Sequence, residues 1–206
     1  MCNLYRLTTT VEAIRDLFRA MEGDSPNLPL LAEFYPARPA PVVVEQGEGR
    51  ALVRMTWGVP PPPGVARPVT NIRNLESPFW RPMLSGTQRC LVPVSAFAEW
   101  SAAPDPSTGR KRKHWFALRS APLFAFAGLF RRADEGWRFA FLTCPPNRMV
   151  GAVHPGAMPV ILSGDSADQW LSGVEARLLQ RPWLDADMVE LADGTSDGLA
   201  QPRPIG

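Results

Sequence analysis

The second residue of the chain is a cysteine, and a cysteine in that place can offer chemistry that an internal cysteine cannot. If Met1 is removed, Cys2 carries a free α-amine beside its thiol. An amine forms a Schiff base with a carbonyl group, and a neighbouring thiol can then add to the imine carbon. The alternative is that Cys2 is simply a small residue at the start of a strand, so the rest of the sequence has to decide between the two roles.

Three other polar residues lie where the surrounding pattern does not require them. Glu99 is near the end of an apolar run, where a carboxylate could equally be solvated or pair with an arginine. His154 precedes a Pro-Gly turn and could be an ordinary loop histidine, and Asn71 could hydrogen-bond its own loop. Histidine and carboxylate side chains are common proton-transfer groups. With Cys2, these residues are the candidates for a reactive site.

Cysteine and histidine usage argues against a metal site and against a disulfide framework. The cysteines are Cys2, Cys90 and Cys144, and the histidines are His114 and His154. Their spacing matches no zinc motif, and an odd, scattered set of thiols is typical of a reducing compartment. The sequence shows neither a signal peptide nor a run of 18 apolar residues. We therefore expect a cytoplasmic protein with no membrane span, no metal and no cofactor.

Composition fits one globular domain. The chain has 206 residues, of which 45% are hydrophobic and 20% charged, enough for a full core. The net charge of +2 permits a polyanionic partner without requiring one, so nucleic-acid binding would need a local basic surface. The one charge run is Arg110-Lys111-Arg112-Lys113, which follows a turn and is either a solvated hairpin tip or a nucleic-acid contact.

Two helices are expected to flank the strands. Thr9 to Glu12 reads as a capping box, and the turn at residues 23–26 should end the helix that it starts. Ser166 is expected to begin the second helix in the same way. The apolar face of the first helix would be Val11, Ile14, Leu17, Phe18 and Met21, and that of the second Trp170, Leu171, Val174 and Leu178.

The remainder predicts strands separated by turn residues. A hairpin is expected from residues 42–44 and 51–58 around the turn at 47–49, followed by a proline-rich surface loop at 60–63. Further strand-like runs are 90–93, 96–100, 115–118, 123–130, 138–143 and 158–162. These elements predict a single α+β domain over residues 1–181, with a mostly antiparallel, barrel-like core flanked by a few helices, and a Pro/Gly-rich tail over 182–206.

Four stretches resemble, in order and spacing, the SRAP (SOS-response-associated peptidase) family. They are Met1-Cys2, Asn71-Ile72-Arg73, the run from Arg89 to Trp100, and the run from His154 to Leu162. Members of that family begin with Met-Cys, carry an Asn-x-Arg segment and a Phe-x-Glu-Trp strand, and have a histidine shortly before Met-Pro-Val-Ile-Leu. The resemblance covers residues 1 to about 180 and implies the family's fold.

The resemblance also implies a reaction with abasic sites in single-stranded DNA. The α-amine of Cys2 would attack the sugar aldehyde, and its thiol would close a thiazolidine ring. His154 would supply a proton to the sugar ring, Glu99 would transfer protons near the Cys2 nitrogen, and Asn71 would hold the sugar or the Cys2 backbone. A thiol peptidase that uses Cys2 on itself or on proteins, a lyase activity that releases the adduct, and a non-covalent single-stranded DNA binding module are the other readings.

DNA contacts are expected around these residues in a protein that we expect to be a monomer. Arg73 is the best candidate for a phosphate contact. Pro39 and Trp57 could offer apolar faces beside the lesion, as base stacking is common for single strands, although core packing explains Trp57 equally well. Trp100 and Thr143 are the remaining candidates for DNA contacts.

Two stretches depart from the family pattern. The family commonly begins Met-Cys-Gly-Arg and has Asp-Arg after the histidine, whereas this chain has Asn3-Leu4 and Pro155-Gly156. We therefore expect a rearranged DNA groove in which other cations contact the phosphates.

Overall fold

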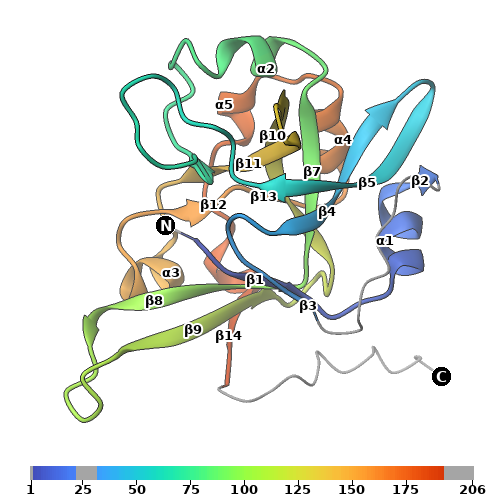
Figure 1. Ribbon diagram of the computed structural model, residues 1–206. Helices are drawn as coiled ribbons and strands as arrows, with labels where there is room; N and C mark the ends of the chain where they lie inside the picture. Colours follow the sequence, from blue (N-terminus) through green and yellow to red (C-terminus); the bar gives the residue numbers. More distant parts are fainter. Residues whose placement is uncertain (1, 22–31, 193–206) are drawn as a thin grey trace, which may run out of the picture.

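The chain folds around a closed β-barrel. The computed structural model describes residues 2–21 and 32–192 (Figure 1). Neighbouring barrel strands pair antiparallel, and one parallel pairing, between the first and the last strand of the series, closes the ring. In ring order the strands are β5 (Gly49–Trp57), β4 (Pro39–Gln46), β7 (Arg89–Val94), β10 (Phe124–Ala133) and β11 (Gly136–Cys144). The predicted α+β domain with a barrel-like core is confirmed.

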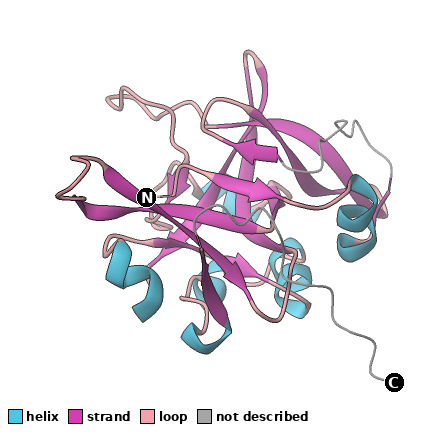
Figure 2. Cartoon of the chain, turned by 90° about the horizontal axis from the view of Figure 1, so that it is seen from below, coloured by secondary structure: helices cyan, strands magenta, loops and turns pink. Residues whose placement is uncertain are grey.

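A second sheet of five strands lies against the barrel. Its centre is β8 (Ala96–Pro104), which pairs on one side with β9 (Lys111–Leu118) and on the other with β1 (Tyr5–Leu7). The edge strands are β14 (Met188–Leu191) beside β9, and β3 (Ala32–Phe34) beside β1. Figure 2 shows the two sheets from below, with the β8–β9 hairpin extending from the body. The N-terminal strand is therefore an inner strand and not a loose end.

Aromatic side chains anchor this N-terminal strand to the barrel. The Tyr5 ring is fully buried and stacks on Phe34 at a centroid distance of 5.1 Å. It also contacts Trp57 and Phe141 at 5.4 and 6.4 Å. Burying a large apolar side chain stabilises a fold by about 1.5–3 kcal/mol, so the strand that follows Cys2 has a fixed position.

Short elements cover the barrel and its ends. The helices are α1 (Val11–Phe18), α2 (Arg81–Ser85), α3 (Arg148–Val153), α4 (Asp165–Leu171) and α5 (Ala176–Leu179), with a 3-10 turn at Asp185–Asp187. The short strands are β2 (Ala20–Met21), β6 (Asn71–Ile72), β12 (Met158–Pro159) and β13 (Ile161–Leu162). Of these, β6, α2 and α3 lie in stretches for which the sequence predicted no element. The run predicted as one strand at 158–162 forms two.

The first helix starts one residue later and ends about one turn earlier than predicted. Its N-cap is Thr10, not Thr9, because the Thr10 hydroxyl accepts a hydrogen bond from the Ala13 N–H at 3.2 Å. Arg19 adopts a left-handed conformation (φ 52°) that ends the helix. Met21 is therefore not on the apolar helix face but in β2, with 61% of its surface exposed. The predicted turn at 23–26 lies outside the described residues.

The C-terminal helix is divided in two. Gly173 has φ +89°, a conformation that interrupts an α-helix, so α4 ends at Leu171 and α5 begins at Ala176. In the separate helix α5, Leu179 is buried and Leu178 is 63% exposed. Leu178 is therefore not on the apolar face on which it was predicted. Ser166 is not the cap, since Gly164 holds the N-cap position.

The second sheet includes part of the segment predicted as a tail. Residues 188–191 form β14, which pairs antiparallel with β9, and Met188 is fully buried. The packed domain therefore continues past residue 181, and residues 193–206 lie outside the described part. In residues 2–21 and 32–192, no helix has the length and apolar character needed to span a membrane.

Candidate functional site

Four strands and loops bring the predicted reactive residues together. Cys2 leads into β1, whose neighbour β8 carries Glu99, and the Ala98 N–H donates to the Leu4 carbonyl at 2.9 Å. Asn71 lies in β6, and its side-chain Nδ2 donates to the Cys2 carbonyl at 2.9 Å. His154 follows α3, with its Nε2 4.0 Å from the Glu99 Oε2. The hydrogen bond from Asn71 to Cys2 alone joins positions 69 residues apart.

The Cys2 thiol is buried and protonated. It is only 1% exposed, and its Sγ donates to the Leu4 carbonyl at 3.5 Å. Burial, with a further contribution from the charge of Glu99, raises the pKa of Cys2 well above its ordinary value. The thiolate is the nucleophilic form of cysteine, so sulfur chemistry at this site requires a base that takes the thiol proton.

Asn71 is held in one orientation by two donated hydrogen bonds. Its Nδ2 donates to the Cys2 carbonyl and to the Thr70 Oγ1, both at 2.9 Å. Its Oδ1 is buried and has no hydrogen-bond partner among the described residues. An unpaired buried acceptor costs about 1–3 kcal/mol, so this oxygen is suited to accept a hydrogen bond from a bound substrate or from an amine on Cys2.

Glu99 is a buried carboxyl with an altered titration. It is 1% exposed, and burial raises the pKa of Glu99 to about 7. At neutral pH the carboxyl group is therefore present in both protonation states. A group whose pKa lies near the working pH can donate a proton in one step and accept one in the next.

His154 is placed by the helix that precedes it. The Asn147 Oδ1 caps α3 by accepting from the Val150 N–H at 2.9 Å, and the His154 N–H donates to the Val150 carbonyl at 2.8 Å. Burial first, and also the positive charge of Lys111, lower the pKa of His154 below its ordinary value. The imidazole is therefore mostly neutral at pH 7.

Gly156 allows the His154 ring to fold over the following turn. A Cβ atom added at Gly156 would lie 2.9 Å from the His154 Nε2, closer than van der Waals contact permits. The Arg73 Nη1 donates to the Gly156 carbonyl at 2.8 Å and fixes this turn to the Asn-x-Arg segment. The Gln180 Nε2 holds that segment from the other side by donating to the carbonyls of Arg73 and Thr143, both at 2.9 Å.

The predicted DNA contacts fall into two groups. Pro39 and Arg73 are exposed, and Trp100 is half-buried, with its indole N–H donating to the Asn3 Oδ1 at 3.2 Å. That these three residues contact DNA stays a prediction. The Trp57 and Thr143 side chains are 0% and 1% exposed and present no surface to a base.

Trp57 acts instead inside the protein. Its Nε1 donates to the Thr70 carbonyl at 3.0 Å, and its ring contacts Phe141 in the barrel at 5.1 Å. The predicted stacking role of Trp57 is therefore wrong for this conformation, and core packing is correct. Trp57 supports the strand that carries Asn71.

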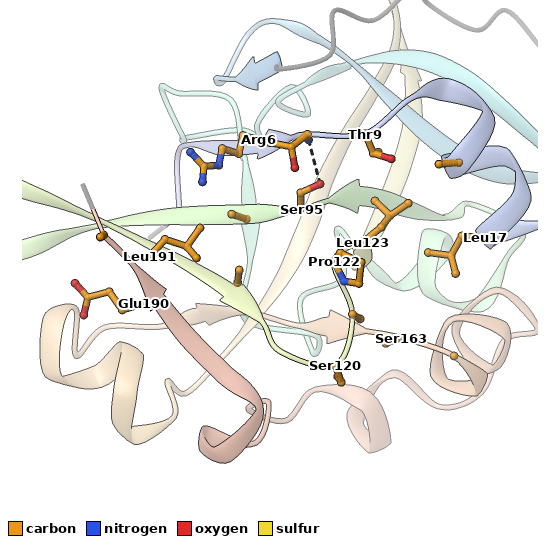
Figure 3. A pocket seen from close by; sticks show the side chains of 17 residues that line it. Arg6, Thr9, Leu17, Ser95, Ser120, Pro122, Leu123, Ser163, Glu190 and Leu191 are labelled. Carbon is orange, nitrogen blue, oxygen red and sulfur yellow. Dashed lines mark hydrogen bonds between the residues drawn. The ribbon is translucent and has the colours of Figure 1, made fainter. Parts of the chain in front are cut away.

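A groove lies elsewhere on the molecule. It has a volume of about 910 Å³ and opens over the five-stranded sheet, between β1, β14 and α1 (Figure 3). Arg6 and Glu190 line one end, and Leu17 and Ser163 line the other. None of the four reactive residues lines this groove. The described residues also contain no group of three or more Cys, His, Asp and Glu side chains placed to hold a metal ion.

The fold and the site define a single-domain barrel protein with a candidate reactive centre around a cysteine that leads into an inner strand. The chain belongs to the SOS response associated peptidase (SRAP) family, whose family profile matches residues 1–191. The predicted membership is thereby confirmed.

Two curated relatives illustrate the similarity in sequence. The abasic site processing protein YobE of Bacillus subtilis (strain 168) is 31% identical over 142 residues, which are 63% of this chain and 63% of YobE. The abasic site processing protein YoqW of Bacillus phage SPbeta is 32% identical over 143 residues, which are 63% of this chain and 61% of YoqW. The chain thus spans less than two thirds of the length of these relatives.

Two solved structures show the same fold. A protein from Bacteroides thetaiotaomicron has a TM-score of 0.72 at 15% identity, and the match covers 92% of this chain and 90% of that one. A protein from Bordetella bronchiseptica has a TM-score of 0.72 at 22% identity. That match covers 92% of this chain and 98% of the Bordetella chain. At these identities the likeness concerns the fold alone.

Proposed function

We propose that this protein processes abasic sites in single-stranded DNA by forming a covalent cross-link through Cys2. The observation that carries the proposal is the convergence of Asn71, Glu99 and His154 on this one cysteine, including a hydrogen bond from Asn71 to the Cys2 carbonyl. The names of the curated relatives, which are abasic site processing proteins, support the same substrate. The reaction requires that the peptide bond before Cys2 has been cleaved, so that its α-amine is free.

The first step opens the sugar and forms an imine. The neutral His154 imidazole takes the proton of the C1′ hydroxyl and passes it to the ring oxygen as the C1′–O4′ bond breaks, which leaves an aldehyde at C1′. The Cys2 nitrogen uses its lone pair to attack C1′ and forms a carbinolamine. Glu99, in its protonated form, then gives a proton to the departing hydroxyl, and one water leaves.

The second step closes the ring. Glu99 is now a carboxylate and takes the proton of the Cys2 thiol, whose raised pKa makes this assistance necessary. The sulfur attacks the carbon of the protonated imine, and the nitrogen takes the electron pair of the C=N bond and keeps its own proton. A five-membered thiazolidine results, and Glu99 ends protonated as it began. The Asn71 Oδ1 accepts a hydrogen bond from the amine or from the opened sugar during both steps.

The product shields the lesion, since the imine that would otherwise permit strand cleavage has been consumed. We expect a monomer to carry out this reaction in the cytoplasm, on the DNA. The family description includes the word peptidase, and a thiol peptidase that uses Cys2 or a slow lyase that releases the adduct would need the same residues. The raised pKa of Cys2 disfavours the thiolate that a peptidase nucleophile requires.

A cross-linking assay with two cysteine variants tests the proposal. The protein is mixed with a single-stranded oligonucleotide that carries one abasic site, and the adduct is separated on a denaturing gel. Neither Cys2→Ala nor Cys2→Ser should give a heat-stable adduct, and each should give at most a labile imine that borohydride traps. A heat-stable adduct with Cys2→Ala would overturn the proposal.

Three further outcomes separate the alternatives. Peptide cleavage without any adduct would favour a peptidase, and reversible binding of the oligonucleotide alone would favour a binding module. An adduct that forms and then releases cleaved DNA would add a lyase step. Cys90→Ala is the matched control, because Cys90 is also fully buried but lies in barrel strand β7.

A further inference from the structure

The β8–β9 hairpin holds most of the excess positive charge of this protein. The whole chain has 22 basic and 20 acidic residues. Residues 101–113 contain four of the basic residues and one of the acidic residues. The rest of the chain therefore has 18 basic and 19 acidic residues, a net charge of −1. The hairpin segment alone therefore carries +3. Long-range attraction of a polyanion would concentrate on this segment.

Its cations are available for a partner. Arg110, Lys111 and Arg112 are exposed, and Lys113 is half-buried with its Nζ 5.1 Å from the Trp115 ring centre. Within the described part of the chain, the salt bridges engage other side chains. The nearest acid in the sequence, Asp105, accepts hydrogen bonds from residues of its own turn. Asp105 is the one acidic residue of the segment 101–113, and hydrogen bonds in its turn, together with the charge of Arg112, lower its pKa, so the segment keeps its net charge of +3.

The hairpin is also ordered. The Asp105 N–H donates to the Arg110 carbonyl at 2.8 Å, and the Gly109 N–H donates to the Asp105 carbonyl at 2.8 Å. Gly109 has φ +67°, as this tight turn requires. A preformed arm of this kind loses little conformational freedom when it binds.

The base of the hairpin is part of the reactive site. Glu99 pairs with His114 and Trp100 pairs with Lys113 across the two strands. Directly paired residues lie on the same face of a sheet, and alternate residues of one strand share that face. Lys111 and Lys113 therefore share a face with Trp100, opposite to the face of Glu99. The Trp100 indole donates to the Asn3 side chain, so this face still reaches the residue next to Cys2.

We propose that Lys111 and Lys113 bind successive phosphates of the DNA strand on one side of the abasic site. They are two residues apart on a strand, which places their Cα atoms about 7 Å apart, a spacing comparable to that of successive phosphates in an extended single strand. The positive charge of Lys111 also acts on His154, consistent with a path that begins at the site. Figure 1 shows the hairpin leaving the body next to α3, the helix that precedes His154. The inference rests on the proposed function in one respect: the strand that the lysines bind is taken to be the one that carries the abasic site.

The first test measures binding without chemistry. The probe is an unmodified thymine oligonucleotide, which has no aldehyde, and its affinity is measured by fluorescence anisotropy over a series of salt concentrations. Each phosphate contact on a single strand contributes about 0.7 to the slope of log K against log salt. Lys111→Gln with Lys113→Gln should lower the slope by about 1.4 for two lost contacts. An unchanged slope would overturn the proposal.

The matched control removes two charges from another place. Arg131 and Arg132 lie at the end of β10, where they pair with the beginning of β11, while Asn71 pairs farther along β11 at Phe141. Arg131→Gln with Arg132→Gln should leave the salt slope unchanged. An equal loss in both double variants would show a general effect of net charge and would also overturn the proposal.

The second test uses lesion position. Oligonucleotides with an abasic site at the 5′ end or at the 3′ end extend from the site in only one direction. The lysine double variant should slow the cross-linking of one of the two at limiting DNA, and leave the rate at saturating DNA unchanged. Equal slowing of both oligonucleotides would contradict phosphate binding on one side of the lesion. If wild type binds but never cross-links, the proposed function fails while the binding test still decides the role of the hairpin.

Discussion

At the scale of single residues, burial determines what each reactive group can do. Glu99 and Cys2 are both 1% exposed, and burial favours the neutral form of each. A protonated carboxyl beside a protonated thiol can give its proton in the first step of the proposed reaction and take one in the second. The low exposure of the site also keeps water from an imine.

The titration of Glu99 should be visible in the stability of the protein. Burial raises its pKa from 4.5 to about 7, so the folded state favours the protonated form. The stability that this group contributes is fully present below pH 4.5 and is lost as the pH rises through 7. Glu99→Gln does not titrate, and it should gain on the order of 2–3 kcal/mol over wild type between pH 4.5 and 8. Urea unfolding at the two pH values measures the difference, and parallel pH profiles would contradict it.

Gly156 gives a residue-scale test of the position of His154. Gly156→Ala would place a Cβ 2.9 Å from the His154 Nε2 and push the ring away. The cross-linking rate at saturating DNA should fall by roughly tenfold or more, because small displacements of a catalytic group are costly. Gly151→Ala in α3 is the control, since its Cβ would meet Pro146 at an ordinary 3.5 Å. Equal rates for wild type and Gly156→Ala would show that the ring position does not matter.

At the scale of elements, short strands position the site although they add little to the core. Strand β6 has two residues and pairs with β11, and Asn71 at its start reaches Cys2. Three side chains hold this segment in place: Trp57 at the Thr70 carbonyl, Gln180 at the Arg73 carbonyl, and Thr143 at the Ile72 carbonyl.

Trp57→Phe separates a supporting role from DNA stacking. The substitution keeps an aromatic ring and removes the N–H that donates to the Thr70 carbonyl at 3.0 Å. The account predicts slower cross-linking, a loss of about 1–2 kcal/mol in the free energy of unfolding, and unchanged affinity for an undamaged single strand. Weaker binding of the undamaged strand with a normal cross-linking rate would instead support stacking on this ring.

At the scale of the whole molecule, the barrel and the second sheet share the N-terminal strand. Tyr5 packs among barrel aromatics, while the backbone of the same strand pairs with β8 and β3. This double anchoring brings Cys2 to the junction of the two sheets, where β8 and α3 supply Glu99 and His154. The proposed reactive centre therefore depends on the whole fold and not on one loop.

Local patterns in the sequence predicted most strands, because alternation and turn residues act over a few positions. The limits of the helices were less predictable: Gly173 breaks a regular helical pattern through its positive φ, and β14 forms only because β9 is there to pair with it. The candidate site residues were chosen because their types and order resemble those of a known family. The structure places them close together, and their chemical roles stay predictions. The supporting residues Thr70, Gly156 and Gln180 were missed, since their roles depend on contacts between distant segments.

The central claim is that Cys2 forms a thiazolidine with an abasic site, and intact mass spectrometry tests it most directly. Protein from which the residue before Cys2 has been removed is mixed with an abasic single strand, and the adduct is digested to locate the modified residue. The account predicts a mass equal to protein plus oligonucleotide minus one water, carried by the peptide that begins with Cys2. An adduct on another residue, or no adduct from protein with a free Cys2 amine, would contradict it.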